Sequence, residues 1–141
     1  MQHDRDDSDA PAAAAALVEN FYALLTSGDA AAVAAFVSNN FAADAQLIRP
    51  KSLPGGGVRS GVERIGRFMS AAVAGGSGLE LRSVHVAPGV GSVAVFAELG
   101  LAIGESNTTA LEWWTYTGGR FTSLAAYYWD TAALLAPTEQ G

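Results

Sequence analysis

Hydrophobic positions recur with two different spacings along the chain, first every three or four residues and later every second residue. The first spacing is typical of amphipathic helices, and the second is typical of strands with one buried face. The pattern therefore predicts a helical part, interrupted by one early strand, that is followed by a sheet-forming part. Helices are expected over 12–26, 30–37 and 62–73, and strands over 43–50, 79–87, 90–103, 108–117 and 120–129.

Capping and turn residues mark the boundaries between these elements. Gly28 suits the left-handed residue that ends a helix, and Asp29 suits the N-cap of the next one. Ser60 and Glu63 form a capping box ahead of the third helix. Segment 51–59 contains three consecutive glycines, and no Lys-Thr or Lys-Ser pair follows them, so a plain loop is expected rather than a phosphate-binding one.

Runs of helix followed by runs of strand predict an α+β fold, with three N-terminal helices packed on a curved, mostly antiparallel sheet. A chain of 141 residues, 50% of them hydrophobic, is expected to form a single domain that buries roughly 70% of its unfolded surface. This domain is expected over 11–136. Residues 1–10 are acidic and lack periodicity, which predicts a disordered tail, and 137–141 form a polar C-terminal tail.

The charge pattern argues against several classes of partner. The net charge is −6, Lys51 is the only lysine, and the seven arginines are scattered, so no basic stripe for nucleic acid is expected. No apolar run reaches the ~20 residues that span a bilayer, and no secretory signal is evident. The chain has no cysteine, so we expect a cytoplasmic protein without disulfides or Cys-ligated metal, and we expect no cofactor.

The most informative stretch is 108–130, which carries all three tryptophans and three of the four tyrosines and breaks only at Gly118-Gly119. Such a pattern predicts a hairpin of two long strands. A two-residue loop at 105–106 would place Leu99 opposite Glu112, on the wholly apolar face of its strand. Glu112, Trp114 and Tyr116 would then point inward under the helices, while Glu98 and Trp113 would point outward.

A carboxylate inside an apolar cup is a candidate for acid–base chemistry, because desolvation raises its pKa. Glu112 is therefore one candidate catalytic residue, and Arg49, which is expected to reach inward at the end of its strand, is the other. Arg49 would bind or polarise a substrate oxygen. The alternative is structural: Glu112 satisfied by Arg49 or by a backbone group, and Arg49 in a partly exposed salt bridge.

Further residues are expected to shape a substrate pocket. His85 shares a predicted face with Leu79 and Leu81, and it is either an acid–base group or a hydrogen-bonded core residue. Tyr22 lies near the inner side of the first helix, where packing is favoured over proton donation. The expected pocket residues are Trp114, Tyr116, Tyr128, Tyr22, Phe21, Leu99 and His85. On the outer face, Trp113 with Tyr127 or Trp129 would leave too large an aromatic surface in water, which suggests a homodimer through that face.

Three segments resemble the nuclear-transport-factor-2-like superfamily, which includes SnoaL-like cyclases, ketosteroid isomerase and limonene-epoxide hydrolase. They are FYALLTSGDAAAVAAFV (21–37), VRSGVERIGRFM (58–69) and EWWTYTGGRFTSLAAYYWD (112–130). With the order of elements, the resemblance covers nearly the whole chain after residue 12. It implies a cone-shaped α+β barrel around an apolar pocket, commonly dimeric through the outer sheet face.

The catalytic residues of these relatives carry over only in part. The isomerase's oxyanion-hole tyrosine falls at Phe21, with Tyr22 adjacent, and its general base falls at Arg49. Only its protonated oxyanion-hole acid has a match, at Glu112. The epoxide hydrolase's catalytic Arg-x-Asp would fall near Phe96 and Glu98, so that site is not matched.

Three functional hypotheses follow. The first is a cofactor-free enzyme, such as a cyclase, isomerase or dehydratase, that acts on an apolar small molecule. The second is a module that binds an apolar ligand, or an anion through Arg49, without chemistry. The third is a dimerisation domain with a filled core. The fold alone does not choose among them.

Overall fold

The computed structural model describes residues 2–75, 79–89, 94–103 and 105–135, with side chains described from residue 12 onward except at positions 79, 103 and 133. The helices are α1 (Gln2–Ser27), α2 (Ala30–Asn40), α3 (Val62–Gly75) and α4 (Thr131–Leu135), and the strands are β1 (Phe41–Arg49), β2 (Gly57–Ser60), β3 (Leu79–Pro88), β4 (Ala94–Ile103), β5 (Ser106–Thr117) and β6 (Arg120–Tyr128). The α+β class is confirmed. The predicted C-terminal tail and residues 90–93 of one predicted strand lie outside the described residues.

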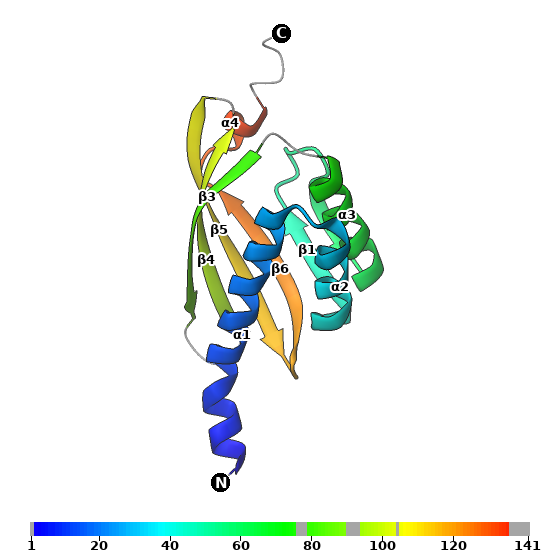
Figure 1. The fold of residues 1–141 in the computed structure, drawn as a ribbon, viewed down its shortest axis with the longest axis vertical. Coiled ribbons are helices and arrows are strands. Elements are labelled where there is room, and N and C mark those ends of the chain that lie inside the picture. The colour runs from blue at the N-terminus through cyan, green and yellow to red at the C-terminus, as the bar shows by residue number, and fades with distance from the viewer. Residues whose placement is uncertain (1, 76–78, 90–93, 104, 136–141) are drawn as a thin grey trace.

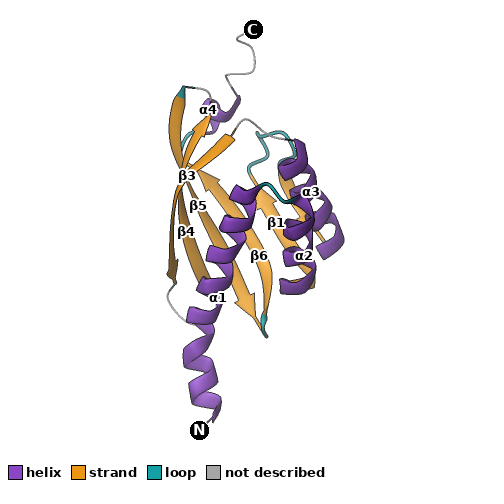
Figure 2. Ribbon diagram, in the orientation of Figure 1, coloured by secondary structure: helices purple, strands orange, loops and turns teal. Residues whose placement is uncertain are grey.

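The strands form one sheet in the order β2-β1-β6-β5-β4-β3. Strands β3 to β6 are the predicted antiparallel meander, and β1 joins it by pairing in parallel with β6. The sheet is curved, and three helices cover one face: α1 crosses β3 and β4, while α2 and α3 lie beside β1 (Figures 1 and 2). Within the described residues, no helix combines the length and hydropathy needed to cross a membrane.

Helix α1 begins at Gln2 and includes Pro11, so it runs through the segment for which a disordered tail is predicted. Alanines at 10 and 12–16 have the highest helix propensity, and acidic residues favour the positive end of the helix dipole. The stretch lacked hydrophobic periodicity because that signal reports burial against other elements. The N-terminal part of α1 instead projects past the end of the sheet (Figure 1).

The junction of α1 and α2 follows the prediction. Gly28 is left-handed, with φ 77°, and its amide bonds the Leu25 carbonyl. Asp29 caps α2 by accepting a hydrogen bond from the Ala32 amide at 3.0 Å. Asp29 therefore satisfies one of the free amides of the first turn of α2, at the point where the chain turns sharply between the two helices.

The region before α3 differs from the prediction in two ways. Residues 57–60, expected to be loop or cap, form the edge strand β2, which pairs with β1. Gly61 then precedes the helix with φ 103°, and its carbonyl accepts the Ile65 amide. Ser60 therefore belongs to a strand and is not the N-cap. A four-residue strand beside a glycine-rich loop is too short to show a clear alternation.

The β4–β5 register differs from the expected one by two residues. Glu112 pairs with Ala97, and Leu99 pairs with Ala110, because the turn closes one residue earlier, with Ile103 opposite Ser106. A shift of two residues preserves the face of every side chain, since the period of a strand is two. Glu112 and Trp114 therefore still point inward.

A bulge in β3 overturns the expectation for His85. The register shifts between Leu81 and Ser83, so that Leu81 pairs with Leu101 but Val84 pairs with Leu99. The extra residue moves all later side chains to the opposite face. His85 lies opposite Glu98 on the outer face and is exposed. It is not part of the pocket.

Candidate functional site

A cavity of about 630 Å³, here called the inner cavity, lies between the helices and the concave face of the sheet. Residues of α1, α3, β1 and β3 to β6 line it, and most of them are apolar. The leucines of its wall are Leu25, Leu47, Leu81, Leu99, Leu101 and Leu124. Its volume is typical of a site for a small organic molecule.

Glu112 is held in the wall of this cavity by a chain of hydrogen bonds. The Tyr22 hydroxyl donates to Glu112 Oε1, and the Trp114 indole nitrogen donates to the Tyr22 oxygen at 3.1 Å. Trp114 is fully buried, so its only donor has to find an internal partner. Because the tyrosine oxygen accepts from Trp114, its own proton is directed at Glu112.

Arg49 reaches the same cavity from the end of β1. Its guanidinium lies over the Phe68 ring, 5.3 Å from the ring centre, and interacts with the Tyr128 hydroxyl. Arg49 Nη1 is buried and has no hydrogen-bond partner among the described residues. Tyr128 also lines the cavity, so one cation and three ionisable oxygen groups from α1, β5 and β6 meet at its polar end.

Burial sets the protonation states of these groups. It raises the pKa of Glu112, and the hydrogen bond from Tyr22 and the charge of Arg49 oppose this only in part. Burial and the neighbouring Glu112 carboxylate hold the pKa of Tyr22 well above its usual value. The pKa of Tyr128 is also raised, by burial and then by Glu112, against the effect of Arg49.

This arrangement suits proton transfer. A carboxyl group with a raised pKa is a stronger base than an ordinary one and can both accept and return a proton, whereas the raised pKa of Tyr22 favours its protonated form, which donates to Glu112. The Arg49 guanidinium can stabilise a negative oxygen through its N–H groups. Among residues 12–75, 79–89, 94–103 and 105–135, no three His, Asp or Glu side chains come together in a way that could hold a metal ion.

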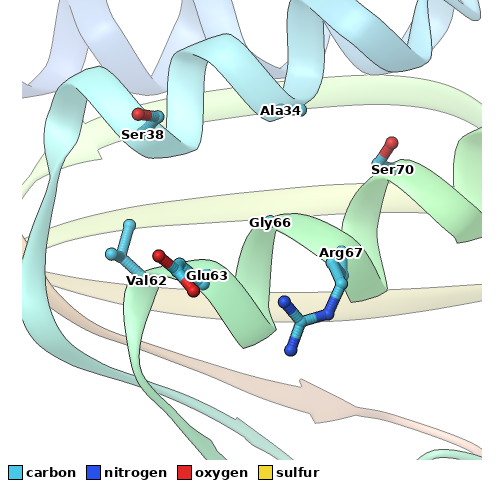
Figure 3. Close-up of a pocket in the computed structure, with 7 residues that line it drawn as sticks. All are labelled: Ala34, Ser38, Val62, Glu63, Gly66, Arg67 and Ser70. Atoms are coloured by element: carbon cyan, nitrogen blue, oxygen red, sulfur yellow. The ribbon is translucent and has the colours of Figure 1, made fainter.

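A second hollow, of about 310 Å³, lies between α2 and α3 (Figure 3). Its charged side chains, Glu63 and Arg67, are exposed to solvent, as expected for a groove between two surface helices. It shares no residue with the inner cavity. The desolvated polar groups that acid–base chemistry requires belong to the inner cavity.

No protein-family model matches this sequence, and no curated protein matches it. Solved structures do match. An NTF2-like protein of unknown function from Cytophaga hutchinsonii aligns with a TM-score of 0.62 at 18% identity, over 84% of this chain and 91% of its own. A candidate polyketide cyclase from Xanthomonas campestris aligns with a TM-score of 0.65 at 16% identity, over 92% and 97%. The epoxide hydrolase/cyclase-like enzyme SalBIII, involved in pyran ring formation in the polyether salinomycin, aligns with a TM-score of 0.60 at 16% identity, over 93% and 96%.

The chain has the nuclear-transport-factor-2-like fold. Six of the residues expected at the site line the inner cavity: Glu112, Arg49, Tyr128, Tyr22, Phe21 and Leu99. The structure therefore brings together residues from α1, β1, β4, β5 and β6. The most distant pair, Phe21 and Tyr128, is 107 positions apart in the sequence.

Three expected pocket residues lie elsewhere. Trp114 is fully buried behind the cavity and contributes through its bond to Tyr22. Tyr116 packs against Phe121, with ring centres 4.8 Å apart, near the β5–β6 turn and away from the cavity. His85 is exposed on the outer face, for the reason given above.

Sequence reasoning underestimated Tyr22 and did not find Phe68 as a partner of Arg49. Tyr22 was expected to pack, but its hydroxyl bonds Glu112. The available signal was its position between Val18 and Leu25 on the inner side of the helix, since a buried tyrosine hydroxyl needs a partner. The contact between Phe68 and Arg49 depends on the angle between α3 and β1, which no local pattern encodes.

Proposed function

We propose that the protein is a cofactor-free acid–base enzyme that acts on an apolar small molecule bearing a carbonyl or similar oxygen, by isomerisation, cyclisation or dehydration. One observation carries the proposal: the Glu112 carboxyl, fixed by Tyr22, shares an apolar cavity with a buried Arg49 nitrogen that has no partner among the described residues. A core assembled only for stability would pair or exclude such groups.

In the proposed reaction, the Glu112 carboxylate takes a proton from a carbon next to the substrate carbonyl. The electron pair of the C–H bond moves onto the carbonyl oxygen, and Arg49 stabilises the resulting enolate. The protonated Glu112 then returns the proton to another position or to a leaving oxygen. Tyr22, donating to Glu112, keeps the carboxyl group oriented between the two steps.

Exchange of hydrogen for deuterium tests the first step without knowledge of the natural substrate. We expect the protein to accelerate deuterium incorporation next to the carbonyl of 2-tetralone, an apolar ketone, as followed by NMR in D₂O. Glu112→Gln should lower the protein-dependent rate by about 10²–10⁴-fold, the usual contribution of a general base. Glu98→Gln, the same change on the exposed outer face, is the matched control and should leave the rate unchanged.

The alternative is a module of the same fold that binds ligands without catalysis. It is supported if 2-tetralone binds but the protein-dependent exchange is absent. Exchange at the same rate in Glu112→Gln as in the unchanged protein would instead show catalysis that does not use Glu112. Binding is measured separately by calorimetry. Absent exchange would refute proton abstraction by the protein, and an unchanged rate in Glu112→Gln would refute the role of Glu112 as the base.

We also propose a cytoplasmic homodimer joined through the outer face of the sheet. Leu111, Trp113 and Tyr127 are 42%, 43% and 53% exposed there, and Trp113 packs on Phe96. An apolar surface of this kind favours contact with a second copy. Sedimentation should show a dimer that Trp113→Arg weakens, and a monomer at all concentrations would contradict this assembly.

A further inference from the structure

The polar groups of the inner cavity differ in whether other groups of the protein provide their hydrogen-bond partners. Trp114, Tyr22 and Glu112 satisfy one another through successive hydrogen bonds. Arg49 is satisfied only in part, because its Nη1 is buried and has no partner among the described residues. A buried donor without an acceptor costs free energy, and the cost is larger when the donor belongs to a charged group.

The surroundings of Arg49 favour a partner from within the cavity. Phe68 covers the guanidinium from α3, and Tyr128 interacts with it from β6. These contacts hold the side chain in place. Arg49 is also one of the residues that line the cavity, so a molecule bound there contacts this side chain. A planar guanidinium with free N–H groups matches a carboxylate better than any neutral oxygen.

The charges around the cavity favour an anion as well. The ionisable groups that face Glu112 are Tyr22 from α1, Arg49 from β1 and Tyr128 from β6, while Glu80 of β3 is exposed at the rim. The residues that α3 and β4 contribute to the wall are apolar. Burial raises the pKa of Glu112, which favours its neutral form and so leaves less negative charge beside Arg49.

We infer that the ligand of the inner cavity is an apolar carboxylic acid, bound as the carboxylate on Arg49 with its hydrocarbon part among the leucines. This deepens the proposed function and depends on the same site, with Glu112 acting on the carbon skeleton that the carboxylate anchors.

The test compares two ligands of nearly equal shape, 2-naphthoate and 2-naphthamide, by calorimetry on the full chain. We expect 2-naphthoate to bind at least about tenfold more tightly, the effect of one hydrogen bond to a charged partner. Arg49→Met should abolish this preference. Arg59→Met is the matched control, because Arg59 also lies on the Phe68 ring, 3.9 Å from its centre, but does not line the cavity.

Equal affinities for the two ligands in the unchanged protein, or no binding of 2-naphthoate at millimolar concentration, would overturn the inference. So would a preference that persists in Arg49→Met. The comparison on the unchanged protein needs no variant, so it holds even if Arg49→Met fails to fold. Exchange of 2-tetralone without a carboxylate preference would refute this inference alone, whereas a preference without exchange would refute only the proposed catalysis.

Discussion

The two ends of the space between the helices and the sheet are built by the same strands but filled differently. β1 and β6 run parallel, and their first residues bring Phe41 and Phe121 together, while their last residues bring Arg49 and Tyr128 to one end of the inner cavity. At the first end, rings from α1, α2 and β5 complete an aromatic cluster. Its members are Phe21, Phe36, Phe41, Trp114 and Phe121, with neighbouring ring centres 4.9–5.9 Å apart.

The difference shows how one layer can be both rigid and hollow. Rings packed edge to face leave little room and fix the angle of α1 on the sheet. At the other end, aliphatic side chains such as Leu99 and Leu101 line the wall without meeting across it. Tyr22 and Trp114 join the two ends, because both pack in the aromatic cluster and lead by hydrogen bonds to Glu112.

Removing a large side chain should therefore cost more at the packed end. Phe121→Ala is expected to lower the free energy of unfolding by about 3–5 kcal/mol, since a fully buried ring leaves a void. Leu99→Ala, in the cavity wall, should cost about 2 kcal/mol, because that side chain lacks partner atoms on one side. Urea unfolding measures both. Equal losses would contradict the distinction between the ends.

Tyr22 connects the ends, and removing its hydroxyl should affect the chemistry. Tyr22→Phe is expected to slow the Glu112-dependent exchange of 2-tetralone about 10–100-fold, because Glu112 loses its donor and Trp114 loses its acceptor. Tyr116→Phe is the matched control, since Tyr116 packs against Phe121 away from the cavity, and should leave the rate unchanged. A Tyr22→Phe variant with full activity would show that the hydrogen-bond chain is dispensable.

Adding volume should also lower the stability more where the interior is packed than where it faces the cavity. Ala45→Leu, at a fully buried position outside the cavity wall, is expected to cost about 1–3 kcal/mol of unfolding free energy through overpacking. Ala126→Leu, which enlarges a side chain facing the inner cavity, should change stability by about 0.5 kcal/mol or less and should weaken ligand binding. If Ala126→Leu destabilises as much as Ala45→Leu, the cavity is not open in solution.

The pH dependence of the free energy of unfolding should include a contribution from Glu112, at the hollow end of the interior. The unfolded chain ionises Glu112 at its ordinary pKa, while burial favours the neutral form in the folded protein. Stability should therefore fall as the pH rises from the ordinary pKa to the raised one, and then level off. Urea unfolding across this range should show the fall in the unchanged protein and in Glu98→Gln, but a smaller one in Glu112→Gln. A constant difference between the unchanged protein and Glu112→Gln would refute the raised pKa.

Much of this architecture follows from local patterns. The alternation of 108–130 and the spacing of apolar residues in the helices predicted the meander, the three helices and the inward direction of Glu112. The predicted direction of the Glu112 side chain is correct although the predicted register is not, because a shift of two residues leaves each side chain on the same face of the sheet. The end of α1 was missed, since periodicity reports burial and the helix continues where it buries little.

The site was predictable in composition but not in its contacts. Glu112 and Arg49 were identified from their positions on predicted strands, and both line the cavity. The bond from Tyr22 to Glu112 joins residues 90 positions apart, and it depends on how α1 crosses the sheet. The outward turn of His85 depends on one extra residue in β3, and alternation cannot show such an insertion.

That extra residue also makes the lining of the cavity sensitive to how β3 pairs. If Arg82 were deleted, β3 would pair regularly, with Ser83 still opposite Gly100 and Val84 still opposite Leu99, and His85 would stay on the outer face. If β3 kept Arg82 but paired without the bulge, the segment up to Pro88 would exchange its two faces. An imidazole would then replace a valine among the leucines, within the same enclosed space as Glu112. The bulge therefore keeps a second proton carrier out of the cavity, and chemistry on this sheet can diversify by changes in strand pairing as well as by substitution.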